Sequence, residues 1–237
     1  MCGRYSLFVP PEDLAGQFDI TVEEYRPRYN AAPSQELPVI TDQDSERLRR
    51  LEWGLIPSWA DSRDGGGHIN ARAESAADKP SFRDSFQQSG GDLAAGRCLV
   101  PADGFYEWVD EDGGKQPYRV TLGEEGAFAM AGLWAQWRPP TTQTGLDSFG
   151  SDSQPETEIV ETFTVVTTAP NDLVADLHHR MAVILDPSKY DQWLTADPDE
   201  AAALLDPYPS EKMGAYPVST AVNDPANDSP SVVEPIE

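Results

Sequence analysis

Cysteine is scarce in this chain. Only Cys2 and Cys98 occur among its 237 residues, which excludes the framework of several disulfides that stabilises small secreted domains. Unpaired thiols are typical of a reducing compartment, so we expect a cytoplasmic location. Cys98 belongs to the apolar run Cys98-Leu99-Val100 and is expected to be a buried strand residue.

Positive charge is scarce as well. Lys and Arg number 17 against 41 Asp and Glu, which gives a formal net charge of -24 at pH 7. Such a balance ordinarily argues against a nucleic-acid partner, because phosphate binding requires a basic surface. The low lysine content nevertheless resembles that of halophilic proteins, and at about 1 M salt the Debye length falls to about 3 Å. The positions of the few arginines therefore matter more than the total charge.

Long apolar runs are absent. No segment approaches the ~20 residues needed to span a bilayer, and the N-terminus lacks the apolar region of a signal peptide, so no membrane association is expected. The three histidines and two cysteines lack the spacing of a zinc site, and we expect neither a metal nor a cofactor. Internal repeats and heptads are missing, and the length fits one large domain, expected to be a monomer.

The order of the expected elements favours an α+β fold. Strands and helices are mixed without a βαβ rhythm, so we expect a single domain, residues 1–237, with a curved, largely antiparallel, barrel-like sheet and peripheral helices. Composition predicts a flexible acidic insertion at 139–158 and an extended C-terminal tail at 218–237. Helices are expected at 11–18, 81–88, 186–193 and 199–205, and strands at 37–41, 47–55, 97–109 (broken at 101–104), 118–122, 127–137, 163–168 and 181–185.

The most reactive feature of the sequence is its second residue. If Met1 is removed, Cys2 carries an α-amine and a thiol on adjacent carbons. Such a 1,2-aminothiol condenses with an aldehyde to an imine, and the thiolate then closes a five-membered thiazolidine. Both groups have reference pKa values of about 8, so they react near neutrality. A cysteine at a frayed terminus without function is the alternative at this point.

Three further segments combine reactive residues with turn-forming or apolar neighbours. They contain Asn70, Glu107 and His178, in Ile69-Asn70-Ala71-Arg72-Ala73-Glu74, Gly104-Phe105-Tyr106-Glu107-Trp108 and Leu177-His178-His179-Arg180-Met181. Each residue taken singly also has a structural explanation: a turn for Asn70, an exposed strand charge for Glu107, a surface position for His178. Spacing alone does not show that the segments converge in space.

Together with Cys2, these segments resemble the SRAP (SOS response-associated peptidase) family. The resemblance runs in order through Met1-Cys2-Gly3-Arg4, Arg28-Tyr29-Asn30-Ala31-Ala32-Pro33, Trp53-Gly54-Leu55-Ile56-Pro57-Ser58-Trp59, Asn70-Ala71-Arg72-Ala73-Glu74, Pro101-Ala102-Asp103-Gly104-Phe105-Tyr106-Glu107-Trp108, His178-His179-Arg180-Met181 and the segment from Tyr216 to Asn223. It implies covalent capture of abasic sites in single-stranded DNA through the N-terminal cysteine, as part of the DNA damage (SOS) response.

The resemblance also implies roles for individual residues. Cys2 would be the nucleophile, Asn70 would hold the amine and the sugar oxygen, Glu107 would be the general acid or base, and His178 would assist proton transfer on the sugar. The family motif places its histidine two residues before Arg180, which selects His178 over His179.

A second set of residues is expected to contact DNA. Arg4, Asn30, Arg72 and Arg180 would bind phosphates, and Trp53 and Trp108 would stack on bases beside the lesion. Core positions are expected for Trp59, Trp134 and Trp137. Partners would be abasic single-stranded DNA and replication-fork proteins, with association with the nucleoid when bound to DNA.

Two other functions stay open at this stage. Cys2 could attack an acyl carbon with His178 as base, as in an N-terminal-nucleophile amidase or cysteine peptidase. The protein could instead bind single-stranded DNA without a covalent bond, which would make Cys2 incidental. Self-removal of Met1 and reopening of the adduct by Glu107, a lyase-like and slow turnover, are further activities that the resemblance implies.

Overall fold

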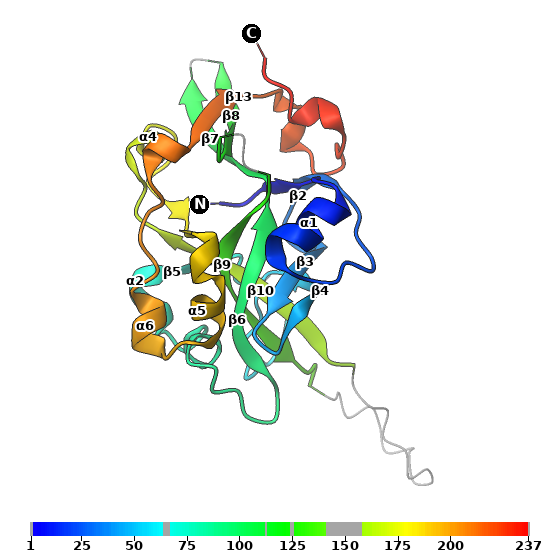
Figure 1. Ribbon diagram of the computed structural model, residues 1–237, viewed down its shortest axis with the longest axis vertical. Helices are drawn as coiled ribbons and strands as arrows, with labels where there is room; N and C mark the ends of the chain where they lie inside the picture. Colours follow the sequence, from blue (N-terminus) through cyan, green and yellow to red (C-terminus); the bar gives the residue numbers. More distant parts are fainter. Residues whose placement is uncertain (1, 64–66, 112, 124–125, 141–157, 237) are drawn as a thin grey trace.

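Two β-sheets, each built from strands far apart in the sequence, form the framework. The computed structural model describes residues 2–63, 67–111, 113–123, 126–140 and 158–236. The first sheet is antiparallel, and its order is β13 (Gly214–Pro217), β8 (Gly114–Thr121), β7 (Gly104–Glu111), β1 (Tyr5–Leu7) and β2 (Arg28–Ala31). In Figure 1 this sheet lies above the second one, and the start of the described chain lies between them.

The second sheet closes on itself. Its order is β11 (Met181–Ala182), β10 (Val160–Thr168), β4 (Asp44–Trp53), β3 (Glu36–Thr41), β6 (Ala95–Ala102), β9 (Phe128–Trp137) and β12 (Ile184–Leu185), and β5 (Asn70–Arg72) pairs with β10. Because β10 also pairs with β9, five of these strands form a closed barrel. Most pairs are antiparallel, while β10 runs parallel to β4 and to β5. The expected curved, largely antiparallel, barrel-like α+β fold is confirmed.

Side chains on both faces of the barrel are buried, as β9 shows. Met130 and Trp134 point to one face and join the core that contains Trp53 and Phe163. The alternating positions, among them Leu133, join a second core on the opposite face. Helices cover that second core, with α3 (Arg83–Phe86) and α5 (Tyr190–Thr195) both packed against β6. A strand buried on both faces is expected to be apolar at nearly every position, which is what the run Phe128–Trp137 shows.

The helices are short and peripheral. The expected helix at 11–18 is confirmed as α1, with Pro11 in its first turn and Leu14 buried. No helix among the described residues has the length and apolar character that crossing a membrane requires. The α-helices are α1 (Pro11–Phe18), α2 (Ala73–Ala76), α3 (Arg83–Phe86), α4 (Asp172–Ala175), α5 (Tyr190–Thr195) and α6 (Pro198–Ala202), and the 3-10 turns are η1 (Pro187–Lys189), η2 (Ser210–Lys212), η3 (Thr220–Asn223) and η4 (Pro230–Val232).

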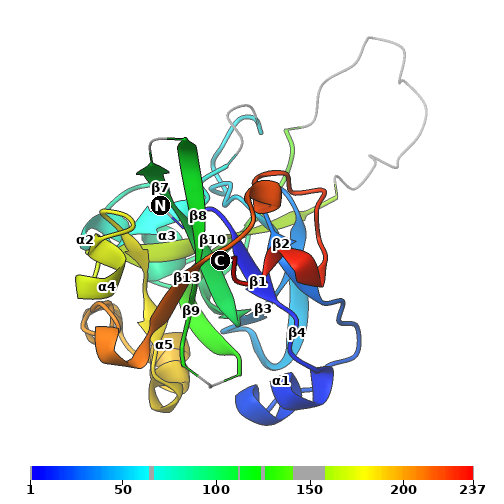
Figure 2. The same ribbon diagram turned by 90° about the horizontal axis from the view of Figure 1, so that it is seen from above.

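The C-terminal tail differs from the expectation. Instead of running extended over 218–237, it forms the turns η3 and η4 and buries Val218, Val222 and Val232 against Tyr106. These apolar side chains give the tail a small core of its own, which an extended segment on the surface could not provide. Figure 2 shows the tail, in red, beside β1, β2 and β13. Of the expected insertion at 139–158, residues 141–157 lie outside the described residues.

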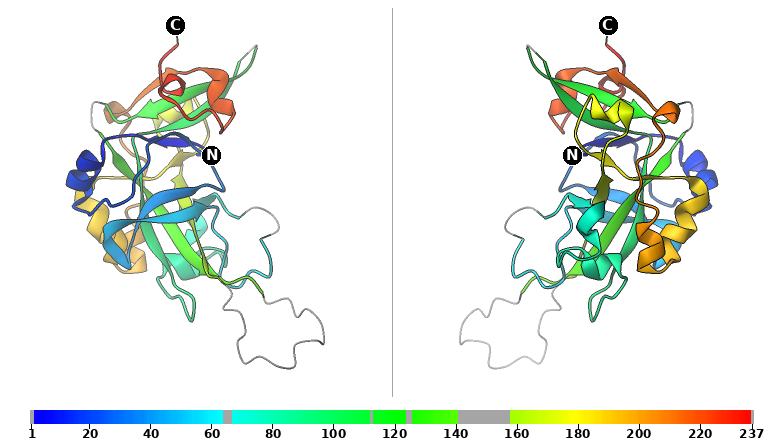
Figure 3. Two further views of the ribbon diagram at one scale, coloured as in Figure 1. Left: turned by 90° about the vertical axis from the view of Figure 1, so that its right-hand side faces the viewer. Right: turned by 90° about the vertical axis from the view of Figure 1, so that its left-hand side faces the viewer.

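Several expected elements have different bounds. The expected helix at 81–88 is limited to α3, and the helix expected at 186–193 begins as η1 before continuing as α5. The strand expected at 97–109 is two strands, β6 and β7, which belong to different sheets and meet at Asp103. Figure 3 shows the two sheets from the sides, with β7 and β8 above the barrel.

Candidate functional site

Cys2 and Asn70 come together where the chain begins. Cys2 is fully buried just before β1, and its backbone oxygen accepts a hydrogen bond of 2.9 Å from Asn70 Nδ2. Asn70 is held there because β5 pairs in parallel with β10, with Asn70 opposite Val165. Its Oδ1 is buried and has no hydrogen-bond partner among the described residues. The site therefore contains an acceptor that a bound amine or hydroxyl group could satisfy.

The Cys2 thiol lies in an environment that keeps it protonated. Burial raises its pKa well above the ordinary value, and the negative charge of Glu107 raises that pKa further. Its one hydrogen bond among the described residues is a weak contact of 3.9 Å from Sγ to the Arg4 carbonyl oxygen. With residue 1 still attached, the thiol is therefore neutral and inaccessible to solvent.

Glu107 reaches the site because side chains alternate along β7. Phe105 belongs to the core that contains Cys2, whereas Tyr106 and Trp108 belong to the small core beneath the C-terminal tail. Glu107 is on the same side as Phe105, and its side chain is 2% exposed. Burial raises the pKa of Glu107 to about 7, so the carboxyl group can donate or accept a proton near neutrality.

His178 approaches the same carboxyl group from the turn after α4. Its Nδ1 lies 4.0 Å from Glu107 Oε2 and 3.0 Å from both the backbone nitrogen and the backbone oxygen of Arg180. Burial lowers the pKa of His178, so the imidazole is neutral at neutral pH. The adjacent His179 is exposed. The structure thus brings together Cys2, Asn70, Glu107 and His178, which spacing alone could not show.

Three of the residues expected to bind phosphate are at least partly accessible. Arg72 is exposed on β5. Arg180 forms a bidentate ion pair with Glu74, at 2.5 and 2.9 Å, and donates to the Thr167 carbonyl oxygen. Arg4 donates from Nη1 to Val222 O, and its guanidinium lies 5.9 Å from the centre of a Trp108 ring. Arg180 and Arg4 are therefore each held in one orientation by their protein partners.

The structure contradicts the expected DNA contacts of Trp53 and Asn30, because both side chains are fully buried. Trp53 packs between Tyr5 and Phe163, with ring centres 5.2 and 6.1 Å apart, and donates to Ile69 O. Asn30 accepts from Arg4 and directs its amide group to carbonyl oxygens of the C-terminal tail. Trp53 is therefore a core residue. Asn30 contacts Arg4 and the tail, and it is not available to bind a phosphate itself.

Trp59, which was expected in the core, is exposed instead. Its side chain is 58% exposed, in the loop after β4, and its indole nitrogen donates to Pro80 O at 3.3 Å. A cavity of about 260 Å³ beside it is lined in part by Ile56 and His68, and His68 is two residues before Asn70. The polar neighbours in Pro57-Ser58-Trp59-Ala60-Asp61-Ser62 were the available sign of exposure. The expected core positions of Trp134 and Trp137 are confirmed.

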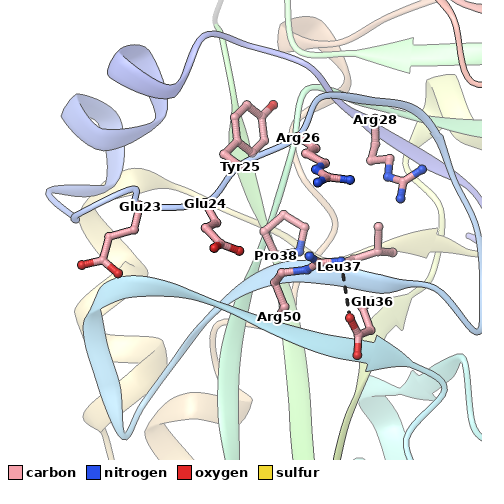
Figure 4. Close-up of a pocket in the computed structure, with 9 residues that line it drawn as sticks. All are labelled: Glu23, Glu24, Tyr25, Arg26, Arg28, Glu36, Leu37, Pro38 and Arg50. Carbon is pink, nitrogen blue, oxygen red and sulfur yellow. Dashed lines mark ion pairs between the residues drawn. The ribbon is translucent and has the colours of Figure 1, made fainter.

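A larger pocket, of about 360 Å³, lies elsewhere on the surface (Figure 4). Three arginines and three glutamates line it, and one of its ion pairs joins Arg50 to Glu36 at 3.4 Å. None of its lining residues belongs to the group around Cys2. Because the arginines and glutamates are equal in number, the pocket has no net charge that would favour an anionic or a cationic ligand.

Comparisons of sequence and structure relate the chain to known proteins. The family model described as SOS response associated peptidase (SRAP) matches residues 1–225. The "Abasic site processing protein YoqW" of Bacillus subtilis (strain 168) is 42% identical over 244 residues, covering 99% of each chain. The "Abasic site processing protein HMCES" of Gallus gallus is 32% identical over 247 residues, covering 90% of this chain and 67% of the relative. A crystal structure of a Bacteroides thetaiotaomicron protein superposes with a TM-score of 0.81 at 28% identity and 100% coverage of both chains. The chain belongs to the SRAP family.

Proposed function

We propose that this protein captures abasic sites in single-stranded DNA by forming a covalent bond to Cys2 after Met1 has been removed. The observation that carries the proposal is the placement of Cys2 against Asn70 and beside a carboxyl group with a pKa of about 7. Relatives along the whole chain that are named abasic site processing proteins support the same substrate.

The chemistry follows from the two nucleophiles of Cys2. An abasic deoxyribose opens to an aldehyde at C1′, and the α-amine attacks this carbon. A bond from nitrogen to C1′ forms, and the aldehyde oxygen leaves as water, which produces an imine. The sulfur then adds to C1′, and the thiol proton passes to nitrogen. The product is a thiazolidine, and the net change is loss of one water molecule.

The neighbouring groups match the proton transfers of this reaction. The protonated form of Glu107 donates a proton to the departing oxygen, and its ionised form accepts one from the amine or the thiol. A pKa of about 7 keeps both forms populated at neutral pH. The neutral His178 lies within 4.0 Å of Glu107 and can exchange protons with the sugar hydroxyl. The unpaired Oδ1 of Asn70 accepts from the free amine and orients it.

Removal of Met1 has a second consequence besides freeing the amine. While residue 1 is attached, the Cys2 nitrogen is an amide, which is not nucleophilic, and the thiol is buried. Cleavage replaces the amide by an amine and removes the residue that precedes Cys2. We therefore expect the unprocessed protein to be inactive towards abasic DNA.

Arg4, Arg72, Arg180 and Trp108 provide the DNA contacts in this proposal, and the exposed Trp59 is added to them as a stacking residue. Trp53 is removed from the set because it is in the core. In a chain with a net charge of -24, these few arginines determine where a phosphate backbone can approach.

The test is intact-mass measurement of the processed protein before and after incubation with an abasic single-stranded oligonucleotide. The expected gain equals the oligonucleotide less one water, and Cys2→Ala abolishes it. Cys98→Ala is the matched control, because the other cysteine is a buried thiol within β6 and carries no α-amine. A processed terminus that gives no adduct, or an adduct retained in Cys2→Ala, would refute the proposal.

Acyl transfer, as in a cysteine peptidase, is the competing function. It requires a thiolate at neutral pH, whereas burial and the nearby Glu107 both raise the pKa of the Cys2 thiol. The raised pKa therefore disfavours acyl transfer, in which the thiolate attacks first, more than aldehyde capture, in which the amine reacts first and the thiol second. Turnover of peptide or amide substrates without adduct formation would favour the peptidase instead.

A further inference from the structure

The C-terminal strap, defined here as residues 218–236, closes into a loop that packs against the first sheet. Val218 pairs with Pro235 in an isolated antiparallel bridge, and Ile236 N donates to Pro217 O at 3.0 Å. Between these ends the chain forms η3 and η4, and its buried valines surround Tyr106. The strap is thus a folded unit with its own apolar contacts.

Polar contacts attach the strap to the edge strand β2. Asn30 Nδ2 lies 3.1 Å from Val222 O, 3.0 Å from Asp224 O and 2.9 Å from Asn227 O. In the opposite direction, Asp228 accepts from two backbone nitrogens of β2 and pairs with Arg28 at 2.9 Å. Because Asn30 is fully buried, replacing these bonds by water is not possible without opening the strap.

The strap also contacts two of the residues to which DNA binding is assigned. Val222 O accepts from Arg4 Nη1 at 2.7 Å, and Asn30 Oδ1 accepts from the same nitrogen at 2.7 Å. Asn223 Oδ1 accepts from Trp108 Nε1 at 2.7 Å. The guanidinium of Arg4 lies beside the Trp108 ring, and each of these two side chains donates a hydrogen bond to η3. The turn η3 therefore fixes the orientation of both.

We infer that Asn223 is a positioning residue for nucleic-acid binding: it holds the Trp108 indole, beside Arg4, in the orientation that receives a base and its phosphate. The inference rests on the proposed function and names a part of the chain that contributes to it without reacting. Asn223 is exposed, so its bond to Trp108 contributes little to folding stability. A side chain that is oriented before binding loses less conformational entropy when DNA arrives.

The experiment measures binding of the processed protein to an undamaged single-stranded oligonucleotide, which separates affinity from covalent chemistry. We expect Asn223→Ala to weaken binding about three- to tenfold, the range that corresponds to one immobilised side chain. Its thermal unfolding midpoint stays at the wild-type value, and so does its rate of adduct formation at saturating abasic oligonucleotide. Ser231→Ala is the control, because Ser231 is an exposed strap residue whose hydroxyl contacts only Ser229 among the described residues.

A double-mutant cycle tests whether the effect passes through the indole. Phenylalanine lacks the Nε1–H group, so Asn223→Ala in a Trp108→Phe background is expected to cause no further loss of affinity. Unchanged affinity in Asn223→Ala, the same loss in both backgrounds, or a loss that follows a lowered unfolding midpoint would each overturn the inference. Failure of the proposed function is distinguishable: wild-type protein would then bind the oligonucleotide and form no adduct with its abasic form.

Discussion

Replacing Glu107 by Gln removes the ionisable carboxyl group of the site while retaining the shape of the side chain. Burial raises the folded-state pKa of Glu107 from 4.5 to about 7, so the folded protein resists ionisation of this carboxyl group and the unfolded chain does not. Because the folded-state pKa is raised, the contribution of this carboxyl group to folding stability is fully present below pH 4.5. It is lost as the pH rises through about 7. Glutamine is neutral at every pH and does not incur this loss.

The magnitude follows from the two pKa values. The loss in the wild type is about 1 kcal/mol at pH 5 and about 3 kcal/mol at pH 8.5. Glu107→Gln is therefore expected to gain stability relative to the wild type by roughly 2 kcal/mol between these two pH values. Its adduct formation is expected to be strongly reduced, because the proposed general acid and base is missing.

Urea denaturation at a series of pH values, under constant salt, measures this difference directly. The informative quantity is the difference in unfolding free energy between the variant and the wild type, followed as a function of pH. Any effect of the amide on packing is independent of pH and does not change this dependence. Parallel stability curves for the two proteins from pH 5 to 8.5 would show that the pKa of Glu107 is ordinary. The reasoning about its catalytic role would then lose its physical basis.

Three further outcomes are expected. Trp53→Ala is expected to lower the free energy of unfolding by about 3–5 kcal/mol, because a fully buried indole is lost; an unfolding curve like that of the wild type would contradict its core position. Trp59→Ala is expected to leave stability within about 0.5 kcal/mol of the wild type and to cost about 1–3 kcal/mol of single-stranded DNA binding, measured by anisotropy; unchanged binding would remove Trp59 from the DNA contacts. Asp224→Asn is expected to strengthen DNA binding at low salt, because the Asp224 carboxylate acts electrostatically on Arg4, and the gain is expected to vanish near 1 M salt; a gain independent of salt would exclude this cause.

The fold class was predictable because the strongest sequence signals belong to the barrel. Runs of apolar and β-branched residues predicted β9 and β10 within a few residues of their bounds. The short strands β2 and β5 were missed, since three or four residues carry no periodicity that identifies a strand. The parallel pairing of β5 with β10 joins residues about a hundred positions apart, and no local pattern specifies it.

Trp53 and Trp59 show that the residues of the site, too, could be predicted only in part from local sequence. The run Trp53-Gly54-Leu55-Ile56-Pro57-Ser58-Trp59 marks both indoles as noteworthy but does not say which of them faces solvent. Leu51 and Trp53 are two residues apart on one strand and share a face, which places Trp53 in the core once Leu51 is known to be buried. Asn30 could not be assigned from sequence, because its partners in the strap are almost two hundred residues away.

The contacts between the beginning and the end of the chain have a consequence during synthesis. Arg4 and Val222, joined by a hydrogen bond, are 218 residues apart, and β1 pairs with β7. Ribosomes add about 5–20 residues per second, so roughly ten seconds or more pass before the strap emerges and the first sheet, which includes β13, is complete. Throughout that interval the bond between Met1 and Cys2 is open to an aminopeptidase on the nascent chain. Under the function proposed above, this interval gives removal of Met1 time to precede the burial of the Cys2 thiol.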